Sequence, residues 1–294
     1  MKKDKNINLK LKKRYKLGLI FLFCLLLFLF YSRYISTSGL IINEYKIKNS
    51  NLPIGFHGLK LVHFSDIHFG RTIQKKELKN IVNKINLITP DLVVFTGDLI
   101  DKNTNLTNKD KKLLIQELKK IKSFYGKYAV SGNHDFTFQE YNEILKSSDF
   151  INIDNDYDII YNENLEKIFI SGLQSELEGK PNLNKILDYI KLTKKEKENN
   201  SYLYKIMIMH TPDTYNKFKN INFDLILAGH SHCGQIRLPF IGSLYTPIGA
   251  KKYYEPYYKI NNTDFFISCG LGVSEINFRL FNKPSLNFYR LTTK

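Results

Sequence analysis

Two histidines stand one residue apart in the stretch "AGHSHCGQIRLP", residues 228–239, directly after an apolar run. His230 and His232 each offer a neutral ring nitrogen, which is a common ligand for divalent transition metals. On an extended strand the two rings would point to opposite faces, so a shared site needs a bent backbone. We expect Gly229 and Gly234 to supply that bend, because glycine reaches positive φ without steric cost. Alone, such a pair is more typical of a polar loop than of a metal site.

The ends of other apolar runs carry side chains of the same kind. These side chains are Asp66, His68, Asp98, Asn133, His134 and His210. Each has an ordinary structural explanation, such as an Asx turn, a helix N-cap or a buried core histidine. However, the loops beyond the carboxyl ends of strands form the site in open α/β sheets. Five segments that all deliver oxygen or imidazole ligands there favour one shared site. We assign His57 and His63 to structural roles.

These residue types predict a site for two divalent ions. Ions about 3.5–4 Å apart need a bridging carboxylate, with one oxygen for each ion, and neutral ligands that leave positions open for water. Oxygen and imidazole ligands without thiolate suit Mn, Fe, Co or Zn. Such a pair of ions acidifies water to hydroxide at neutral pH and neutralises a phosphate. Hydrolysis of a phosphate ester requires both effects.

The intervening sequence is typical of a layered α/β fold, because short apolar runs alternate with helical periodicity. Residues 75–88 and 110–121 are predicted helices. The predicted strands are residues 59–65, 91–97, 128–133, 166–172, 204–210, 223–230, 264–270 and 286–291. The hydrophilic run at residues 191–200 is expected to be a solvated connector, and no internal repeat is evident.

The N-terminus is typical of a membrane signal. Residues 1–16 contain eight Lys or Arg and one acid, and residues 17–31 contain no charge. A bilayer span needs about 20 residues, and snorkelling of Arg33 would lengthen the usable segment. We predict an uncleaved signal anchor over residues 17–35, with a signal cleaved before Gly39 as the alternative. The positive-inside rule then leaves residues 1–16 as a basic cytoplasmic end and places the remainder outside the cytoplasm. Residues 36–57 are expected to be a linker and lead-in to one domain, 58–294.

Composition restricts the partners. The formal net charge is +16, of which +7 lies in residues 1–16, and the rest is spread without a dense basic run. This distribution argues against a nucleic-acid partner. A hydrophobic content of 43% supports a sizeable core. Three cysteines, with Cys24 inside the apolar run, make no disulfide framework and no C-x-x-C pair.

The ordered blocks "SDIH", "GDLID", "GNHD", a strand-ending histidine and "GHSH" resemble the calcineurin-like metallophosphoesterases, over about residues 58–294. The longer stretch "GHSHCGQIRLPFIGSLYTP" and the "SCGLG" block are similar to the membrane-anchored bacterial branch of that family. The resemblance implies a four-layer α/β/β/α sandwich of two mixed sheets, with the site at the strand ends. The metal ligands that it implies are Asp66, His68 and His232 for one ion, Asn133, His210 and His230 for the other, and Asp98 as the bridge.

The resemblance also implies that His134 stabilises phosphoryl oxygens or protonates the leaving oxygen, with Asp101 orienting its ring. The expected activity is metal-dependent hydrolysis of a phosphodiester or phosphomonoester, with a lipid or cell-envelope component as a candidate substrate. One alternative is a lipid pyrophosphate hydrolase of the UDP-2,3-diacylglucosamine type, although the soluble enzymes of that type have Arg where this chain has His134. An alternative of another class is a non-catalytic metal-dependent or nucleic-acid binding module.

Overall fold

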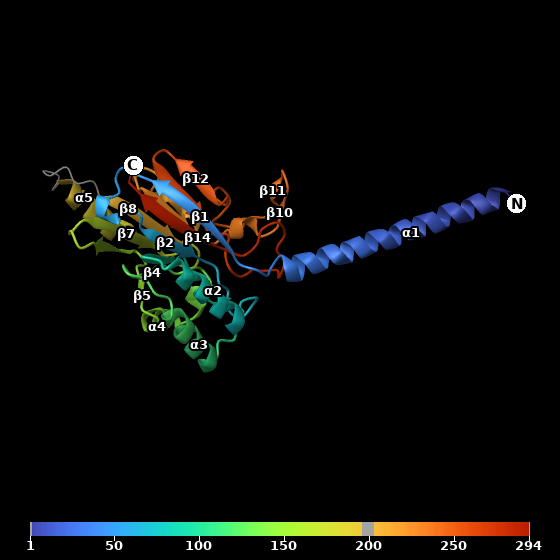
Figure 1. Cartoon of the computed structure of the whole chain (residues 1–294), viewed down its shortest axis with the longest axis horizontal. Helices are drawn as coiled ribbons and strands as arrows, with labels where there is room; N and C mark the ends of the chain where they lie inside the picture. Colours follow the sequence, from blue (N-terminus) through green and yellow to red (C-terminus); the bar gives the residue numbers. More distant parts are fainter. Residues whose placement is uncertain (1, 196–202, 294) are drawn as a thin grey trace.

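A long N-terminal helix projects from one end of a layered α/β domain (Figure 1). The computed structural model of the chain describes residues 2–195 and 203–293. The α-helices are α1 (Lys2–Phe30), α2 (Lys75–Ile88), α3 (Asn108–Lys119), α4 (Tyr141–Ser147) and α5 (Asn184–Lys195). The predicted helix at 75–88 is confirmed, and the one at 110–121 lies two residues earlier.

Two six-stranded mixed sheets form the centre of the domain. The strands are β1 (Ile41–Lys48), β2 (Lys60–Phe64), β3 (Leu92–Phe95), β4 (Lys127–Ala129), β5 (Phe150–Asn152), β6 (Asp156–Tyr161), β7 (Lys167–Leu173), β8 (Tyr204–Met209), β9 (Leu225–Ala228), β10 (Arg237–Leu238), β11 (Gly242–Ser243), β12 (Tyr257–Ile260), β13 (Thr263–Ile267) and β14 (Ser285–Thr292). The first sheet has the order β1-β14-β2-β3-β4-β5, and the second has the order β12-β13-β9-β8-β7-β6. Strands β10 and β11 form a separate hairpin.

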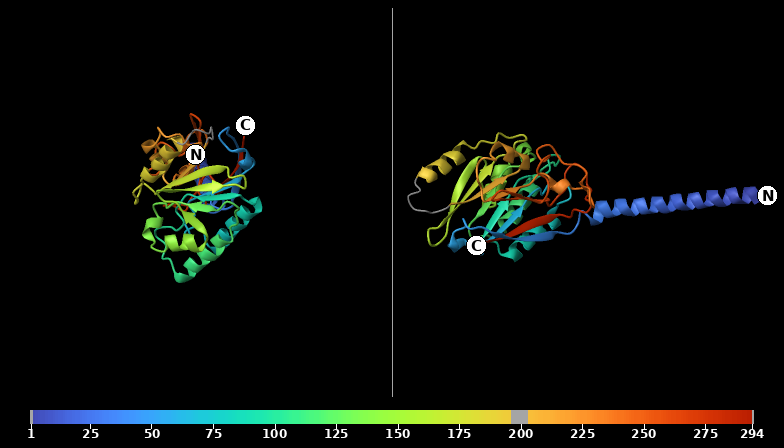
Figure 2. Two further views of the ribbon diagram at one scale, coloured as in Figure 1. Left: turned by 90° about the vertical axis from the view of Figure 1, so that its left-hand side faces the viewer. Right: turned by 90° about the horizontal axis from the view of Figure 1, so that it is seen from above.

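The sheets pack face to face, and helices cover their outer faces. One apolar cluster lies between the sheets and includes Val94, Ile168 and Ile206. A second cluster joins α2, α3 and α4 to the first sheet, and a third joins α5 to the second sheet. Figure 2 shows α2–α4 on one side of the sheets and α5 on the other. The four-layer α/β/β/α sandwich is therefore confirmed.

The segment expected to be a linker, residues 36–57, contains a strand of the domain. Strand β1 pairs in parallel with β14 over its whole length, from Ile41 opposite Ser285 to Lys48 opposite Thr292. The strand lies at a sheet edge and is mostly exposed, so its sequence lacks the apolar run by which the other strands were predicted. Of the expected connector, residues 191–195 belong to α5, and residues 196–200 lie outside the described residues.

The N-terminal helix is long and apolar enough to cross a membrane. Its apolar part continues through a short π-helix, Tyr31–Ile35, so that the candidate span is Lys12–Ile35 with a mean hydropathy of 2.1. The carbonyl of Ser32 accepts a hydrogen bond from the backbone N–H of Arg279 at 3.1 Å. Only residues 36–40 separate this span from β1. The helix therefore ends against the domain.

Candidate metal centre

The carboxyl ends of strands from both sheets meet at one edge of the sandwich, as the sequence predicts. Strands β2 and β3 of the first sheet, and β8 and β9 of the second, deliver six buried candidate ligands. These are Asp66, His68, Asp98, His210, His230 and His232. The loop after β4 adds Asn133 and His134. The structure thus brings together every ligand that the sequence analysis named.

The ligands form two groups. In the first, the Nε2 atoms of His68 and His232 lie 3.1 Å apart, and Asp66 Oδ1 is 3.6 Å from His232 Nε2. In the second, His210 Nε2 lies 3.2 Å from His230 Nδ1. Two nitrogens at about 2.1 Å from one ion are roughly 3.0–3.4 Å apart when they are neighbours around it. Both pairs therefore have the separation of ligands that share an ion.

Asp98 lies between the two groups and faces both with the same atom. Its Oδ2 is 3.6 Å from His68 Nε2 and 3.3 Å from His210 Nε2. Its Oδ1 instead accepts a hydrogen bond from the backbone N–H of His134 at 2.9 Å. One oxygen of Asp98 thus faces both groups, while the other accepts a backbone hydrogen bond; the expectation of one carboxylate oxygen for each ion stays a prediction.

Backbone carbonyls orient the rings of the second group. His210 Nδ1 lies 2.6 Å from the carbonyl oxygen of Thr96, and His230 Nε2 lies 2.7 Å from that of Ile248. In each ring the nitrogen beside the carbonyl carries a proton and donates, so the other nitrogen presents its lone pair to the site. This arrangement fixes the tautomer that a metal ligand needs.

An unsatisfied acceptor supports the fit to a cation. The Oδ1 atom of Asn133 is buried and has no hydrogen-bond partner among the described residues. Asn133 lines the same cavity as Asp98, His230 and His232. A buried amide oxygen without a donor is costly, and a metal ion in the cavity would satisfy it. The donor set and this orphaned oxygen together fit divalent ions.

Of the two glycines that we expected to bend the chain around the histidines, only Gly234 has positive φ, at 72°. His230 and His232 themselves adopt the left-handed conformation, with φ of 65° and 46°. Gly229 does not, and it is required for another reason: a Cβ atom there would lie 2.0 Å from Ser65 Oγ and 2.9 Å from Asp66 Oδ2. Asp66, His68 and Asp98 also have positive φ, between 45° and 58°. Such conformations persist only where the surrounding structure enforces them, and they cluster at functional sites.

His134 is held by a backbone group. Its Nδ1 accepts a hydrogen bond from the N–H of Lys102 at 3.0 Å, so in the neutral ring Nε2 carries the proton. That Nε2 lies 4.0 Å from Asp98 Oδ2 and faces the cavity. Asp101, the expected partner of the ring, lies 3.8 Å from Nδ1 and closer, at 3.6 Å, to Nδ1 of His68. Asp101 therefore stands between two rings of the site.

The electrostatics of the site keep three rings neutral. Burial lowers the pKa of His68 to about 3, that of His230 to about 4, and that of His232 well below its usual range. Burial also acts to lower the pKa of His210, but the adjacent Asp98 carboxylate outweighs it and raises that pKa to about 9. Burial raises the pKa of Asp66 to about 7, against an opposing effect of His210. Neutral imidazoles are the form that binds a metal.

Two features of the site were missed by the sequence analysis. Asp135, the last residue of "GNHD", accepts hydrogen bonds from the backbone N–H groups of Asp98, Leu99 and Gly132, each at 2.8 Å. It thereby fixes the turn that carries Asp98. Arg279 is fully buried, and its guanidinium donates to the carbonyls of the loop after β13, beside the ring of His232. The position of Asp135 in the motif was a usable signal, whereas no local pattern marks Arg279.

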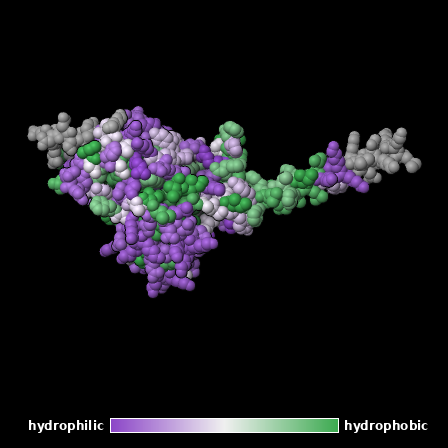
Figure 3. Space-filling view, viewed as in Figure 1, coloured by the Kyte–Doolittle hydropathy of each residue, from purple (hydrophilic) through white to green (hydrophobic). Residues whose placement is uncertain are grey.

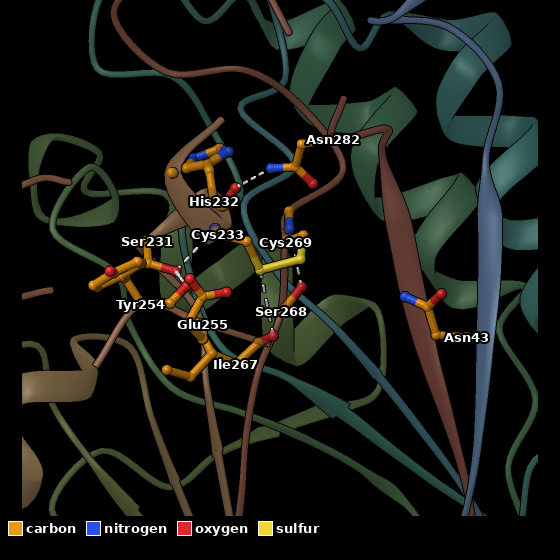
Figure 4. The surroundings of a disulfide bond; sticks show 12 residues. Asn43, Ser231, His232, Cys233, Tyr254, Glu255, Ile267, Ser268, Cys269 and Asn282 are labelled. Carbon is orange, nitrogen blue, oxygen red and sulfur yellow. Dashed lines mark hydrogen bonds between the residues drawn. A yellow bond between two sulfur atoms is a disulfide. The ribbon is translucent and has the colours of Figure 1, made fainter. Parts of the chain in front are cut away.

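A disulfide lies directly behind one ligand, which corrects the expectation from the cysteine count. Cys233 and Cys269 are bonded across 36 residues of sequence (Figure 4). They follow β9 and β13, which are neighbours in the second sheet. The bond ties the turn of His232 to the loop after β13, and Asn282 Nδ2 donates to the His232 carbonyl at 2.6 Å in the same region. The pairing was not predictable without the order of the strands.

His63 has the structural role that was expected. Its Nε2 lies 2.9 Å from Thr96 Oγ1 inside the first sheet, and burial lowers its pKa to about 3. His57 is exposed beside Thr293. Neither ring reaches the two groups of ligands.

The chain belongs to the calcineurin-like phosphoesterase family, whose profile matches residues 59–234. It is 32% identical to the Bacillus subtilis (strain 168) metallophosphoesterase YkuE over 89% of this chain and 88% of that protein. It is 31% identical to the Campylobacter jejuni metallophosphoesterase Cj0846 over 100% of this chain and 74% of that protein. A transmembrane protein with metallophosphoesterase domain from Danio rerio is 26% identical, over 83% of this chain and 55% of that protein. Family and site together make this chain a metal-dependent phosphoester hydrolase.

Proposed function

We propose that this protein is a membrane-anchored phosphoesterase that hydrolyses a phosphodiester or phosphomonoester with two divalent ions, Mn, Fe, Zn or Co. Asp66, His68 and His232 would hold one ion, and Asn133, His210 and His230 the other. The observation that carries the proposal is the single Oδ2 of Asp98, which faces both groups within 3.6 Å. When bound, the ions supply an acidified water and neutralise the charge of the phosphate.

The remaining chemistry falls to His134. Its Nε2–H faces the cavity because the N–H of Lys102 occupies Nδ1. From this position the neutral ring can donate a hydrogen bond to a phosphoryl oxygen. It can give its Nε2 proton to the leaving oxygen only if Nδ1 first gains a proton in place of the hydrogen bond from Lys102. Asp101 would position two rings, that of His134 and that of His68, since it lies within 3.8 Å of both.

The cavity above the ligands supports a substrate with a sizeable organic group. It has a volume of about 590 Å³, and its walls include Tyr245, Pro247, Ile248 and Ile276. These apolar walls, together with the N-terminal helix, also favour the second candidate, a lipid pyrophosphate of the UDP-2,3-diacylglucosamine type. A diester of a membrane component fits the same walls.

A panel of substrates tests the proposed function. The full chain in detergent, loaded with Mn²⁺, should hydrolyse either bis(p-nitrophenyl) phosphate or p-nitrophenyl phosphate, and chain treated with a chelator should not. Faster turnover of a sugar-nucleotide lipid than of either simple ester would establish the second candidate. Metal-dependent binding without turnover of any of the three would instead show a non-catalytic module.

We also propose that the domain lies outside the cytoplasm. The basic residues at the N-terminus favour retention of that end inside, under the positive-inside rule. The Cys233–Cys269 bond supports the same orientation, since disulfides persist in oxidising compartments. External protease should therefore digest the domain in cells whose outer layers have been removed. A domain cut only after lysis would refute this orientation, and a mature N-terminus at Gly39 would show a cleaved signal instead of an anchor.

A further inference from the structure

Large apolar side chains are exposed on the segments that line the cavity, and Tyr245, Ile248 and Ile276 line the cavity itself. We call this set the apolar rim: Phe240, Ile241, Leu244, Tyr245, Ile248, Ile276 and Phe281. Five of them belong to the β10–β11 hairpin and the segment after it, and two belong to the loop before β14. Phe240, at the tip of the hairpin, is fully exposed. Several large exposed apolar side chains on neighbouring segments favour an interaction site.

Polar contacts hold the two parts of the rim in one unit. The guanidinium of Arg237, at the base of the hairpin, donates to both carboxylate oxygens of Glu255 at 2.9 and 2.7 Å. The backbones of the hairpin and the loop also pair: Arg237 N donates to the carbonyl of Leu280 at 3.0 Å, and Leu280 N donates to that of Gln235 at 3.2 Å. These contacts fix the hairpin and the loop relative to each other, with the side chains of the rim exposed.

The rim lies at the end of the domain from which the apolar helix leaves. Figures 1 and 2 both place the β10–β11 hairpin beside the C-terminal end of α1, and Figure 3 shows hydrophobic surface over the hairpin next to the hydrophobic helix. The loop that carries Ile276 and Phe281 contacts the helix end directly, through the hydrogen bond from Arg279 N to Ser32 O. Residues 36–40 span at most about 18 Å when fully extended. A bilayer that contains α1 would therefore lie close to the rim.

Aromatic rings with adjacent cations occur at this end of the molecule. Lys251 Nζ lies 4.9 Å from the centre of the Tyr245 ring, and the guanidinium of Arg33 lies 5.0 Å from that of Tyr34. Rings of this kind, with cations that reach phosphate groups, are enriched where proteins meet the bilayer surface. A protein partner would also cover apolar surface, but continuity with the anchor favours lipid.

We propose that the apolar rim inserts into the interfacial region of the membrane that holds α1, so that the mouth of the cavity opens at the bilayer surface. The insertion then selects phosphate esters that are carried by membrane lipids; this selection of substrate rests on the proposed function. The hairpin and the loop, which pair with each other, would enter the headgroup layer together beside the cavity. A lipid headgroup would then reach the ligands of the site without leaving the bilayer.

The chain contains no tryptophan, so single substitutions give a unique fluorescent probe of membrane contact. The variants are Phe240→Trp on the hairpin and Phe281→Trp on the loop. The matched control is Phe124→Trp, an exposed phenylalanine shortly before the start of β4, at the opposite end of the sheet from the site. Each full chain is reconstituted into phosphatidylethanolamine–phosphatidylglycerol vesicles, with and without bromine on the acyl chains.

Insertion by about 5–10 Å predicts that brominated lipid reduces the emission of both rim variants about twofold and leaves the control unchanged. Emission of both rim variants that matches the control would overturn the proposal and indicate a protein as the occupant. Quenching of the hairpin variant alone would overturn the proposal that the mouth of the cavity opens at the bilayer surface. Turnover of bis(p-nitrophenyl) phosphate by the same samples separates the two proposals: quenching without turnover refutes the proposed function only, and turnover without quenching refutes the rim.

Discussion

Among the described residues that line the cavity, His134 is the histidine that belongs to neither ligand pair. Its replacement by alanine removes a ring N–H from the cavity and leaves both pairs unaltered. The ring is 4% exposed, and one backbone hydrogen bond, from the N–H of Lys102, sets its tautomer. To act as a proton donor from Nε2, the ring must also carry a proton on Nδ1, where the carboxylate of Asp101 lies 3.8 Å away. Its loss should leave the pairs His68–His232 and His210–His230 in place.

The expected loss of rate follows from that role. A positioned general acid contributes roughly 10²–10⁴-fold to turnover, which corresponds to about 2.7–5.4 kcal/mol of transition-state free energy. The full loss should occur with an alkyl ester, whose leaving oxygen needs a proton. With a nitrophenyl ester the loss should be much smaller, because nitrophenolate leaves as an anion. Metal content should stay at two ions.

The assay is turnover of an alkyl and a nitrophenyl diester by His134→Ala and by the control His57→Ala, with metal analysis of each. His57 is exposed and distant from the ligand groups, so its variant should match the unaltered chain. An equal loss with both esters would refute the proton donor and indicate that the ring binds phosphate. Loss of metal in His134→Ala would refute the assignment of ligands at this turn.

Three further outcomes follow from the geometry of the site. Gly229→Ala should destabilise the fold by about 1–3 kcal/mol and release an ion, because the new Cβ would clash with Ser65 Oγ and the carboxylate of Asp66. An unaltered melting temperature and metal content would contradict this. Cys233→Ser should weaken metal affinity about 10–100-fold by freeing the turn behind a ligand, and an unchanged dissociation constant would contradict it. Affinity for Mn²⁺ should rise with pH between about 7 and about 9, because binding displaces a proton from Asp66 and another from His210. Calorimetry in buffers of different ionisation enthalpy measures these protons. An affinity that does not change over this pH range would contradict the prediction.

The sequence predicted the parts of the fold whose signals are local. Buried strands such as β3 and β8 are continuous apolar runs, and α2 has strict helical spacing, so each was found within a few residues. Strand β1 was missed because an exposed edge strand needs no apolar run. Its place in the sheet depends on β14, which lies more than 240 residues further along the chain.

The candidate site was predictable by residue type and only partly by geometry. Ligands that follow strand ends could be grouped because such ends converge. The sequence could not show that backbone groups take one oxygen of Asp98 and Nδ1 of His134, since those contacts depend on how separate loops meet. The left-handed φ of His230 was missed for a similar reason, because the packed surroundings impose it on a residue that does not favour it.

The number of metal ions per chain tests the central claim most directly. After removal of metal and reconstitution of the full chain with Mn²⁺, elemental analysis should give two ions per chain. Asp98→Asn should bind close to none, because it replaces the Oδ2 that faces both groups. One ion or none in the unaltered chain, or two ions retained by Asp98→Asn, would contradict the account.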